Sequence, residues 1–212
     1  TFPVARIPQL SLESGLKMAV IAAGCGLLSI LFCVALKAVS GIYGKYLKNP
    51  YLRVCVAGCL VIGITMLLGT GDYMGAGNEL IARAVEQGKA RPLDFLWKMI
   101  LTAITMRAGY RGGEIVPAFS VGATCGCVAG GLLGFSPEVA AAASMVALFC
   151  GVTNCPIASM LISFELFGFS GAAYYLIAIS ISYALSGYYS LYKDQTIVYS
   201  KYKARYINKK TH

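Results

Sequence analysis

Charged residues are scarce in this sequence of 212 amino acids: they make up 13% of it, whereas a soluble domain carries roughly 25%. Hydrophobic residues make up 58%. A soluble fold of this length does not bury that much apolar surface, so lipid must solvate much of the chain. The composition therefore excludes an ordinary soluble domain and predicts an integral membrane protein in contact with a lipid bilayer.

The residues that build metal sites and enzyme active sites are also few. The terminal His212 is the only histidine, and the eight cysteines lack the two-residue spacing of a zinc site. Nothing resembles a GxSxG, HExxH or Walker-type phosphate motif. We therefore predict no enzyme, no metal and no cofactor, and we expect the cysteines to be small buried apolar side chains. They are Cys25, Cys33, Cys55, Cys59, Cys125, Cys127, Cys150 and Cys155.

Acidic residues are outnumbered by basic ones: 9 Asp and Glu stand against 18 Lys and Arg, which gives a net charge of +9. Because the basic residues lie between and after apolar segments, the excess fits the positive-inside bias of membrane proteins better than nucleic-acid binding. Two basic clusters, 45–53 and 193–210, are therefore expected in the cytoplasm. This predicts a multi-pass protein of the cell membrane with a cytoplasmic C-terminus and no nucleic-acid partner.

Most apolar segments of the chain are short for spanning a bilayer. The first one would form a helix about 36 Å long, but most others fall below the roughly 20 residues that a spanning helix needs. Gly and Pro separate them, and short broken helices are typical of channel and transporter interiors. The predicted fold class is therefore all-α integral membrane, with broken and tilted helices. We expect these helices at 16–39, 54–68, 78–87, 94–106, 116–133, 137–149, 156–167 and 172–191.

The stretch from Gly112 to Pro117 is the most unusual part of the sequence, because glycines, a proline and Glu114 lie there between two apolar helices. A helix that starts inside a membrane directs unpaired N–H groups and the positive end of its dipole at whatever lies before it, which makes an anion site. Glycines just ahead of the helix let an ion approach the backbone. The alternative is an ordinary loop-to-helix turn in which Glu114 stabilises the dipole. The residues alone leave both interpretations open.

Other features of the sequence favour structural roles. Asp94 is expected to cap the helix that follows it, and Thr153 or Asn154 to cap the helix from 156. Glu165 lies in an apolar helix, where an acid is a functional candidate, but we favour a structural acid bonded to a neighbouring helix. A row of glycines four residues apart shares one helix face and predicts close helix packing. This row is Gly122, Gly126, Gly130 and Gly134.

Three segments carry a resemblance to a known family. The segment Gly112–Ala123, with the sequence GGEIVPAFSVGA, resembles the glycine-rich anion motif in the second half of CLC chloride channels and transporters. Gly151–Gly168 is similar to the family's later run of small residues, a proline, an apolar helix and an acid. Val198–Ser200 resembles the tyrosine segment that opens the family's final, cytoplasm-directed helix. The order and spacing of the three segments also agree with the family.

The resemblance implies a specific site and assembly. CLC proteins are homodimers with one anion pathway in each subunit, and each subunit is an inverted repeat of two helical halves. By position, Gly113, Glu114, Ile115 and Val116 would hold a halide anion through their backbone, and the hydroxyl of Tyr199 would reach it from the cytoplasmic side. Taken alone, Tyr199 is also typical of an interfacial anchor. The helices between 156 and 191 would contribute to the dimer interface.

The chain also departs from the family pattern. The motifs of the first half are absent, and Thr1, Phe2 and Pro3 form neither an initiator nor a leader. We therefore expect that residues 1–212 are the second inverted repeat, the C-terminal half of a CLC transmembrane domain cut from something longer, and that the missing N-terminal half is required for transport.

Glu114 is a second departure, since many chloride-selective members carry an apolar residue at this position. The bacterial branch that exports fluoride against protons resembles this pattern, so we favour a fluoride/proton antiporter. Two alternatives stay open. One is a chloride channel or chloride/proton antiporter of the same family, and the other is a truncated membrane fragment or assembly partner that does not transport.

Overall fold

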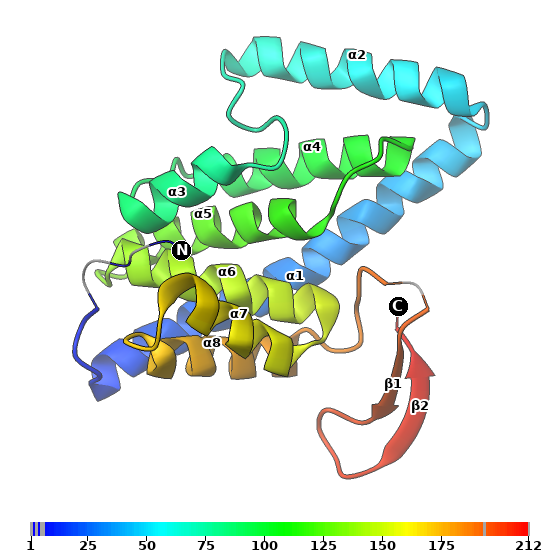
Figure 1. Cartoon of the computed structure of the whole chain (residues 1–212). Helices are drawn as coiled ribbons and strands as arrows, with labels where there is room; N and C mark the ends of the chain where they lie inside the picture. Colours follow the sequence, from blue (N-terminus) through cyan, green and yellow to red (C-terminus); the bar gives the residue numbers. More distant parts are fainter. Residues whose placement is uncertain (1, 3, 5–6, 193, 212) are drawn as a thin grey trace.

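Eight helices and one β-hairpin make up the described part of the chain, which in this computed structural model comprises residues 2, 4, 7–192 and 194–211 (Figure 1). The predicted all-α class is confirmed, because the two strands of the hairpin near the C-terminus are the only strands among the described residues. The helices are α1 (Leu12–Tyr46), α2 (Pro50–Leu68), α3 (Asn78–Glu86), α4 (Asp94–Ala108), α5 (Ile115–Leu132), α6 (Pro137–Thr153), α7 (Pro156–Phe167) and α8 (Ala172–Leu185). The strands are β1 (Thr196–Tyr199) and β2 (Tyr206–Lys210).

Helix α1 is longer than predicted at both ends and has 35 residues. Ser11 caps its start in a reciprocal pair with Ser14, whose amide donates to the Ser11 hydroxyl at 3.1 Å. Gly41, expected in a connection, continues the helix, because a single glycine costs only about 1 kcal/mol inside one. At about 50 Å the helix exceeds the roughly 30 Å thickness of a bilayer core, so it must tilt, and Figure 1 shows it crossing obliquely behind the others.

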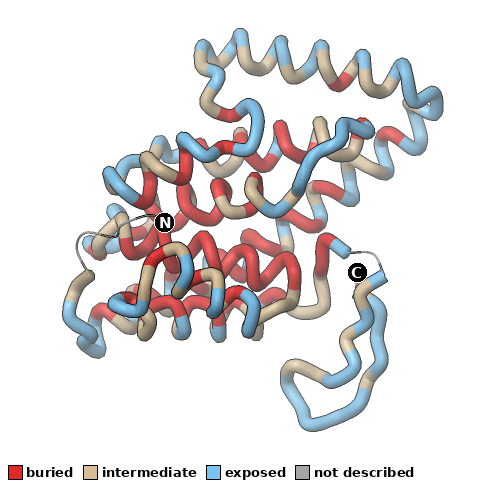
Figure 2. The backbone as a smooth tube through the Cα atoms, in the orientation of Figure 1, coloured by how far each residue is buried: buried red, intermediate tan, exposed pale blue. Residues whose placement is uncertain are grey.

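Helix α6 is the centre of the core, and Figure 2 shows it as the most continuously buried element. The predicted glycine row packs α5 against it: a Cβ on Gly122 would lie 2.7 Å from the Ser144 carbonyl oxygen, and one on Gly126 would lie 2.3 Å from the Ser144 Cβ. Gly130 continues the contact. For Gly134 the prediction was wrong, since it lies beyond the end of α5, has a φ of +61°, and turns the chain toward α6.

The break between α6 and α7 differs from the prediction in its capping. Asn154 ends α6 in the left-handed conformation, with a φ of 57°, and its side-chain amide donates to the Tyr189 carbonyl at 2.8 Å. The Thr153 hydroxyl donates back to its own helix. Neither side chain therefore caps α7, which begins after Cys155 without a side-chain cap bond. Helix α8 stops earlier than predicted, and the chain beyond it returns to α6, where the Leu191 amide donates to the Val152 carbonyl at 2.9 Å.

The segment expected to open a final helix is instead the hairpin of β1 and β2. Thr196, Ile197 and Val198 are β-branched and favour an extended backbone, and they pair antiparallel with β2. The Lys201 side chain fastens the hairpin to the C-terminal end of α8, donating to the Tyr183 carbonyl at 2.9 Å. Two predicted features of this end, the first member of the basic cluster at Lys193 and the terminal His212, lie outside the described residues.

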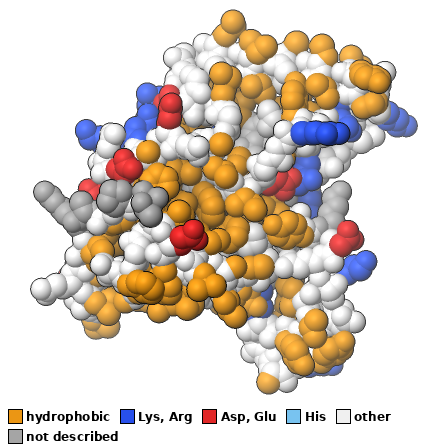
Figure 3. All heavy atoms as spheres, in the orientation of Figure 1, with side chains coloured by type: hydrophobic (Ala, Val, Ile, Leu, Met, Phe, Trp, Pro, Cys, Tyr) orange, Lys and Arg blue, Asp and Glu red, His pale blue; other side chains and the backbone are white. Residues whose placement is uncertain are grey.

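The outer surface is apolar over large areas, as Figure 3 shows for one face. Three helices, α1, α2 and α5, are long and apolar enough to span a membrane. Ala57 is the only buried residue of α2, and most of the large apolar side chains of this helix face outward: Leu52, Leu60, Ile62, Met66 and Leu67. Cys55 and Cys59 are exposed on this helix, so the prediction of burial is wrong for these two cysteines.

A polar network ties the loop after α2 to α3 and α4. Asp94, predicted as a cap, is the first residue of α4; its carboxylate is fully buried and accepts hydrogen bonds from the Tyr73 hydroxyl at 2.6 Å and the Arg91 amide at 2.9 Å. Arg83 joins the two acids of the network, lying 3.5 Å from Asp94 and 3.1 Å from Asp72.

The ion pair between Asp72 and Arg83, at the exposed edge of this network, makes the stability of the fold depend on pH. The hydrogen bond from Arg83 holds the pKa of Asp72 below its usual value. Asp72 therefore has a lower pKa in the folded protein than in the unfolded one. The stabilisation by the ion pair is fully present above the unfolded pKa, and it is lost as the pH falls through the folded pKa. We expect Asp72→Asn to lower stability by about 1 kcal/mol at neutral pH and to leave it unchanged in strong acid. Unfolding midpoints of both proteins across this pH range test the prediction, which fails if their difference is the same at every pH.

Candidate anion site at the start of helix α5

The candidate site forms where the chain leaves α4 and enters α5. Gly109 ends α4 with a φ of +111°, a conformation that suits glycine, and residues 110–113 then run exposed to the start of α5. Glu114 occupies the N-cap position, and its carbonyl accepts the first helical hydrogen bond, from the Ala118 amide at 3.2 Å. The predicted residues Gly113, Glu114, Ile115 and Val116 therefore lie together at the N-terminus of one helix.

The first amides of α5 are available to a ligand. Ile115 and Val116 are its first two residues, and within the described chain their N–H groups have no hydrogen-bond acceptor. Pro117 follows and has no N–H group to satisfy. Two free amides and the positive end of the helix dipole thus point toward the exposed glycines, an arrangement that favours an anion.

The Glu114 side chain turns away from these amides. Its carboxylate lies 3.0 Å from the Arg107 guanidinium at the end of α4, and both side chains are about four-fifths buried, with 22% and 19% exposure. No side-chain cap bond to α5 is formed. Glu114 therefore does not cap α5 through a side-chain hydrogen bond. Both interpretations that the sequence left open, an anion site and a turn in which Glu114 stabilises the dipole, stay predictions. The ion pair also neutralises the carboxylate, which reduces the repulsion that an anion would meet here.

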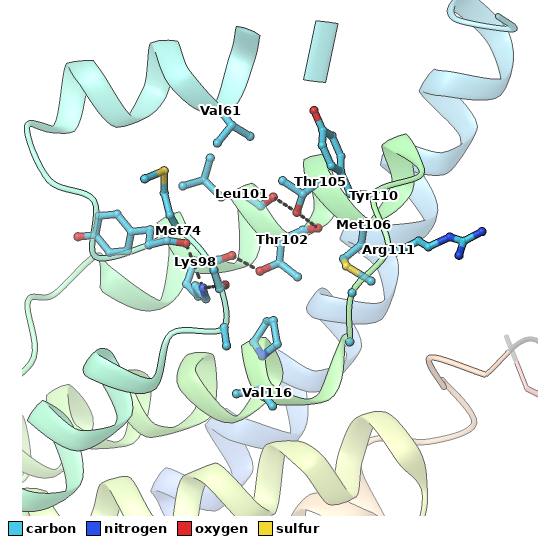
Figure 4. A pocket seen from close by; sticks show the side chains of 16 residues that line it. Val61, Met74, Lys98, Leu101, Thr102, Thr105, Met106, Tyr110, Arg111 and Val116 are labelled. Carbon is cyan, nitrogen blue, oxygen red and sulfur yellow. Dashed lines mark hydrogen bonds between the residues drawn. The ribbon is translucent and has the colours of Figure 1, made fainter. Parts of the chain in front are cut away.

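A cavity of about 490 Å³ lies next to this helix start. It is lined by α2, α4, α5 and two loops and is open on one side (Figure 4). Lys98, Thr102 and Thr105 line it from α4. Val116 and Pro117 line it from α5, beside the glycines 112 and 113. Lys98 is a basic side chain on the cavity wall, whereas the exposed side chain of Arg111 points away from the cavity (Figure 4). None of the described lining residues is an acid.

Two residues near the site, Arg107 and Lys98, are absent from the sequence prediction. The sequence contains one indication of Arg107, since it lies in the same charged stretch as Glu114. Their ion pair, however, depends on how the loop between the two residues folds back. Lys98 sits in an apolar helix with no motif around it. Its importance follows only from its burial, at 1% exposure, and from its place on the cavity wall.

Tyr199 is not brought to this site. It lies on β1, is 68% exposed, and its ring packs edge-on against Tyr206 with centroids 6.0 Å apart. Leu191, in the chain after α8, does belong to the same hydrophobic cluster as Ala118 and Val121 of α5. Glu165, the other acid considered in an apolar helix, is exposed on α7.

Comparisons with known proteins find relatives of this chain. The family described as voltage-gated chloride channel matches residues 1–187. A chloride/fluoride channel protein of Pseudomonas syringae pv. tomato is 33% identical over 193 residues, covering 87% of this chain and 42% of that protein. An uncharacterized protein of Methanocaldococcus jannaschii is 24% identical over 173 residues, covering 80% of this chain and 43% of that protein.

A solved structure is similar as well. The crystal structure of a CLC-type fluoride/proton antiporter superposes with a TM-score of 0.85 at 29% identity, covering 91% of this chain and 49% of that one. The chain therefore spans about half the length of the relatives that it matches. The family consists of channels and transporters, which agrees with the prediction of no enzyme. With a family match across most of its length, this chain belongs to the voltage-gated chloride channel (CLC) family.

Proposed function

We propose that residues 1–212 are the second inverted repeat of a CLC anion pathway and that, joined to a first half, they exchange fluoride for protons across the cell membrane. The observation that carries the proposal is the position of Glu114 at the N-cap of α5, beside two free amides. Amides and a helix dipole hold a small anion, and a carboxyl group can carry the proton that is exchanged for it.

Further features support the same proposal. A carboxyl group that accepts a proton is also a good hydrogen-bond donor to fluoride, the most basic of the halides. Two similar proteins carry fluoride in their descriptions, one as a channel and one as a proton antiporter. The apolar outer faces of α7 and α8 suit a homodimer interface, and the basic hairpin suits a cytoplasmic C-terminus. Tyr199 remains a proposed ligand only if the hairpin rearranges in the complete protein.

Liposomes containing the full-length protein test the proposal. They are loaded with sodium fluoride or sodium chloride, and efflux is followed with an electrode selective for each ion, while a dye inside reports pH. We expect fast fluoride efflux with proton uptake and little chloride efflux, and no efflux from protein-free liposomes. Equal or faster chloride efflux would assign the protein to chloride transport instead, and fluoride efflux without proton movement would assign it to the channels.

A further inference from the structure

Lys98 is a buried cation in the cavity wall whose role the pathway at α5 does not explain. It lies in the second turn of α4, and its ammonium group donates to the Gly75 carbonyl at 2.7 Å and the Tyr73 carbonyl at 3.0 Å. Its third N–H has no acceptor among the described residues. An ammonium group buried this far normally has a counter-ion, because removing it from water is costly.

The described part of the chain offers no such counter-ion. No carboxylate oxygen there lies within 4.0 Å of the Lys98 ammonium. The nearby acids Asp72 and Asp94 are already paired with Arg83, and Arg91 adds a contact to Asp72 at 4.0 Å. Arg83 and Arg91 therefore occupy both carboxylates, and Lys98 is left as one uncompensated positive charge of this cluster.

The surroundings of Lys98 suit a small anion. The cavity is large enough for a partly hydrated halide, and none of its described lining residues is an acid. In Figure 4, Lys98 lies on the same cavity wall as Thr102, across from Val116 at the start of α5. Ser120 lies close to the lysine as well, since a Cβ on Gly77 would be 2.6 Å from the Ser120 hydroxyl and 3.1 Å from the Lys98 ammonium. Lys98, on α4, therefore lies beside the second turn of α5, one to two turns beyond the free amides at the start of that helix.

We propose that Lys98 holds a second anion position in this cavity, separate from the amides of Ile115 and Val116, and that its ligand is a small monovalent anion of the halide type. The ammonium group would complete its third hydrogen bond with the anion and gain the counter-ion that it lacks. Only the choice of halide rests on the function proposed above. The competing role is a clamp that holds the loop at Tyr73 and Gly75 and binds no anion.

Halide binding to the purified full-length protein separates the two roles. Calorimetric titrations with sodium fluoride and sodium chloride, in halide-free buffer, compare the wild type with Lys98→Gln, which keeps donors but removes the charge, and Lys98→Arg, which keeps the charge. We expect Lys98→Gln to weaken one binding event roughly 10- to 100-fold and Lys98→Arg to change it by only a few fold. Lys17→Gln, which removes a partly exposed charge that is paired with Glu13 outside the cavity, is the matched control.

Unchanged halide affinity in Lys98→Gln would overturn the proposal and leave the clamp. If that variant does not fold, wild-type crystals soaked in sodium bromide decide: an anomalous peak within roughly 3.5 Å of the Lys98 ammonium supports the site, and its absence overturns it. The outcome is distinguishable from that of the efflux experiment. If the protein prefers chloride but Lys98→Gln loses halide affinity, the inference holds. If the protein exports fluoride but Lys98→Gln binds halide as the wild type does, the inference is wrong.

Discussion

Fluoride efflux from liposomes is expected to fall by about 100-fold or more when Glu114 is replaced with alanine in the full-length protein. The substitution removes the carboxyl group at the N-cap of α5 but leaves the free amides of Ile115 and Val116 in place. If the carboxyl group carries the exchanged proton, its loss stops coupled exchange although an anion still binds. Proton uptake measured in the same liposomes should disappear together with fluoride efflux.

Two further variants make this result specific. Glu114→Ala leaves the largely buried Arg107 without its ion-pair partner, so a loss of stability must be separated from a loss of mechanism. Adding Arg107→Met to Glu114→Ala removes the unpaired charge, and we expect this double variant to regain stability but not efflux. Glu86→Ala is the control, since this acid is exposed at the end of α3, away from the proposed site and from the outer faces of α7 and α8, and should leave efflux unchanged. Normal fluoride efflux in Glu114→Ala would contradict the proposed mechanism.

The sequence predicted the helix bounds well where neighbouring residues along the chain decide the structure. Helix α7 lies at the predicted residues, and α3 and α5 are within one residue, because Gly and Pro end the apolar segments at these points. The same local reasoning placed Gly113, Glu114, Ile115 and Val116 at the start of a helix. It was less reliable at Gly41, where a glycine was taken for a break although the long apolar run continued through it.

Features that depend on tertiary contacts were beyond this reasoning. Burial of Lys98 requires that the loop at Tyr73 and Gly75 fold over α4, and no spacing along the chain indicates that contact. The position of Tyr199 was inferred from likeness to a family segment, whereas the β-branched residues before it favour the extended strand that is observed. The partner of Glu114 likewise lies at the end of the preceding helix, on the far side of an irregular loop.

Substitution of Gly126 should have the largest effect on stability of any conservative change in α5. A Cβ at this position would lie 2.3 Å from both the Cβ and the hydroxyl oxygen of Ser144 and 2.5 Å from the Ala140 carbonyl oxygen, so α5 and α6 must separate to admit even a methyl group. We expect Gly126→Ala to lower the free energy of unfolding of the full-length protein by about 3 kcal/mol. Thermal unfolding of the purified protein in detergent measures this change.

Gly131, on the same helix, provides the matched comparison. It is exposed, and a Cβ there would meet no atom within 4 Å, so Gly131→Ala should be neutral or raise stability by up to about 1 kcal/mol through helix propensity. If both variants behave alike, the contact between α5 and α6 is looser than described. If only Gly126→Ala is destabilised, the contact with α6 fixes the direction of α5. That direction also sets how the free amides of Ile115 and Val116 point toward an anion. A variant that survives the substitution should then bind halide more weakly, because the helix start moves while its residues stay the same.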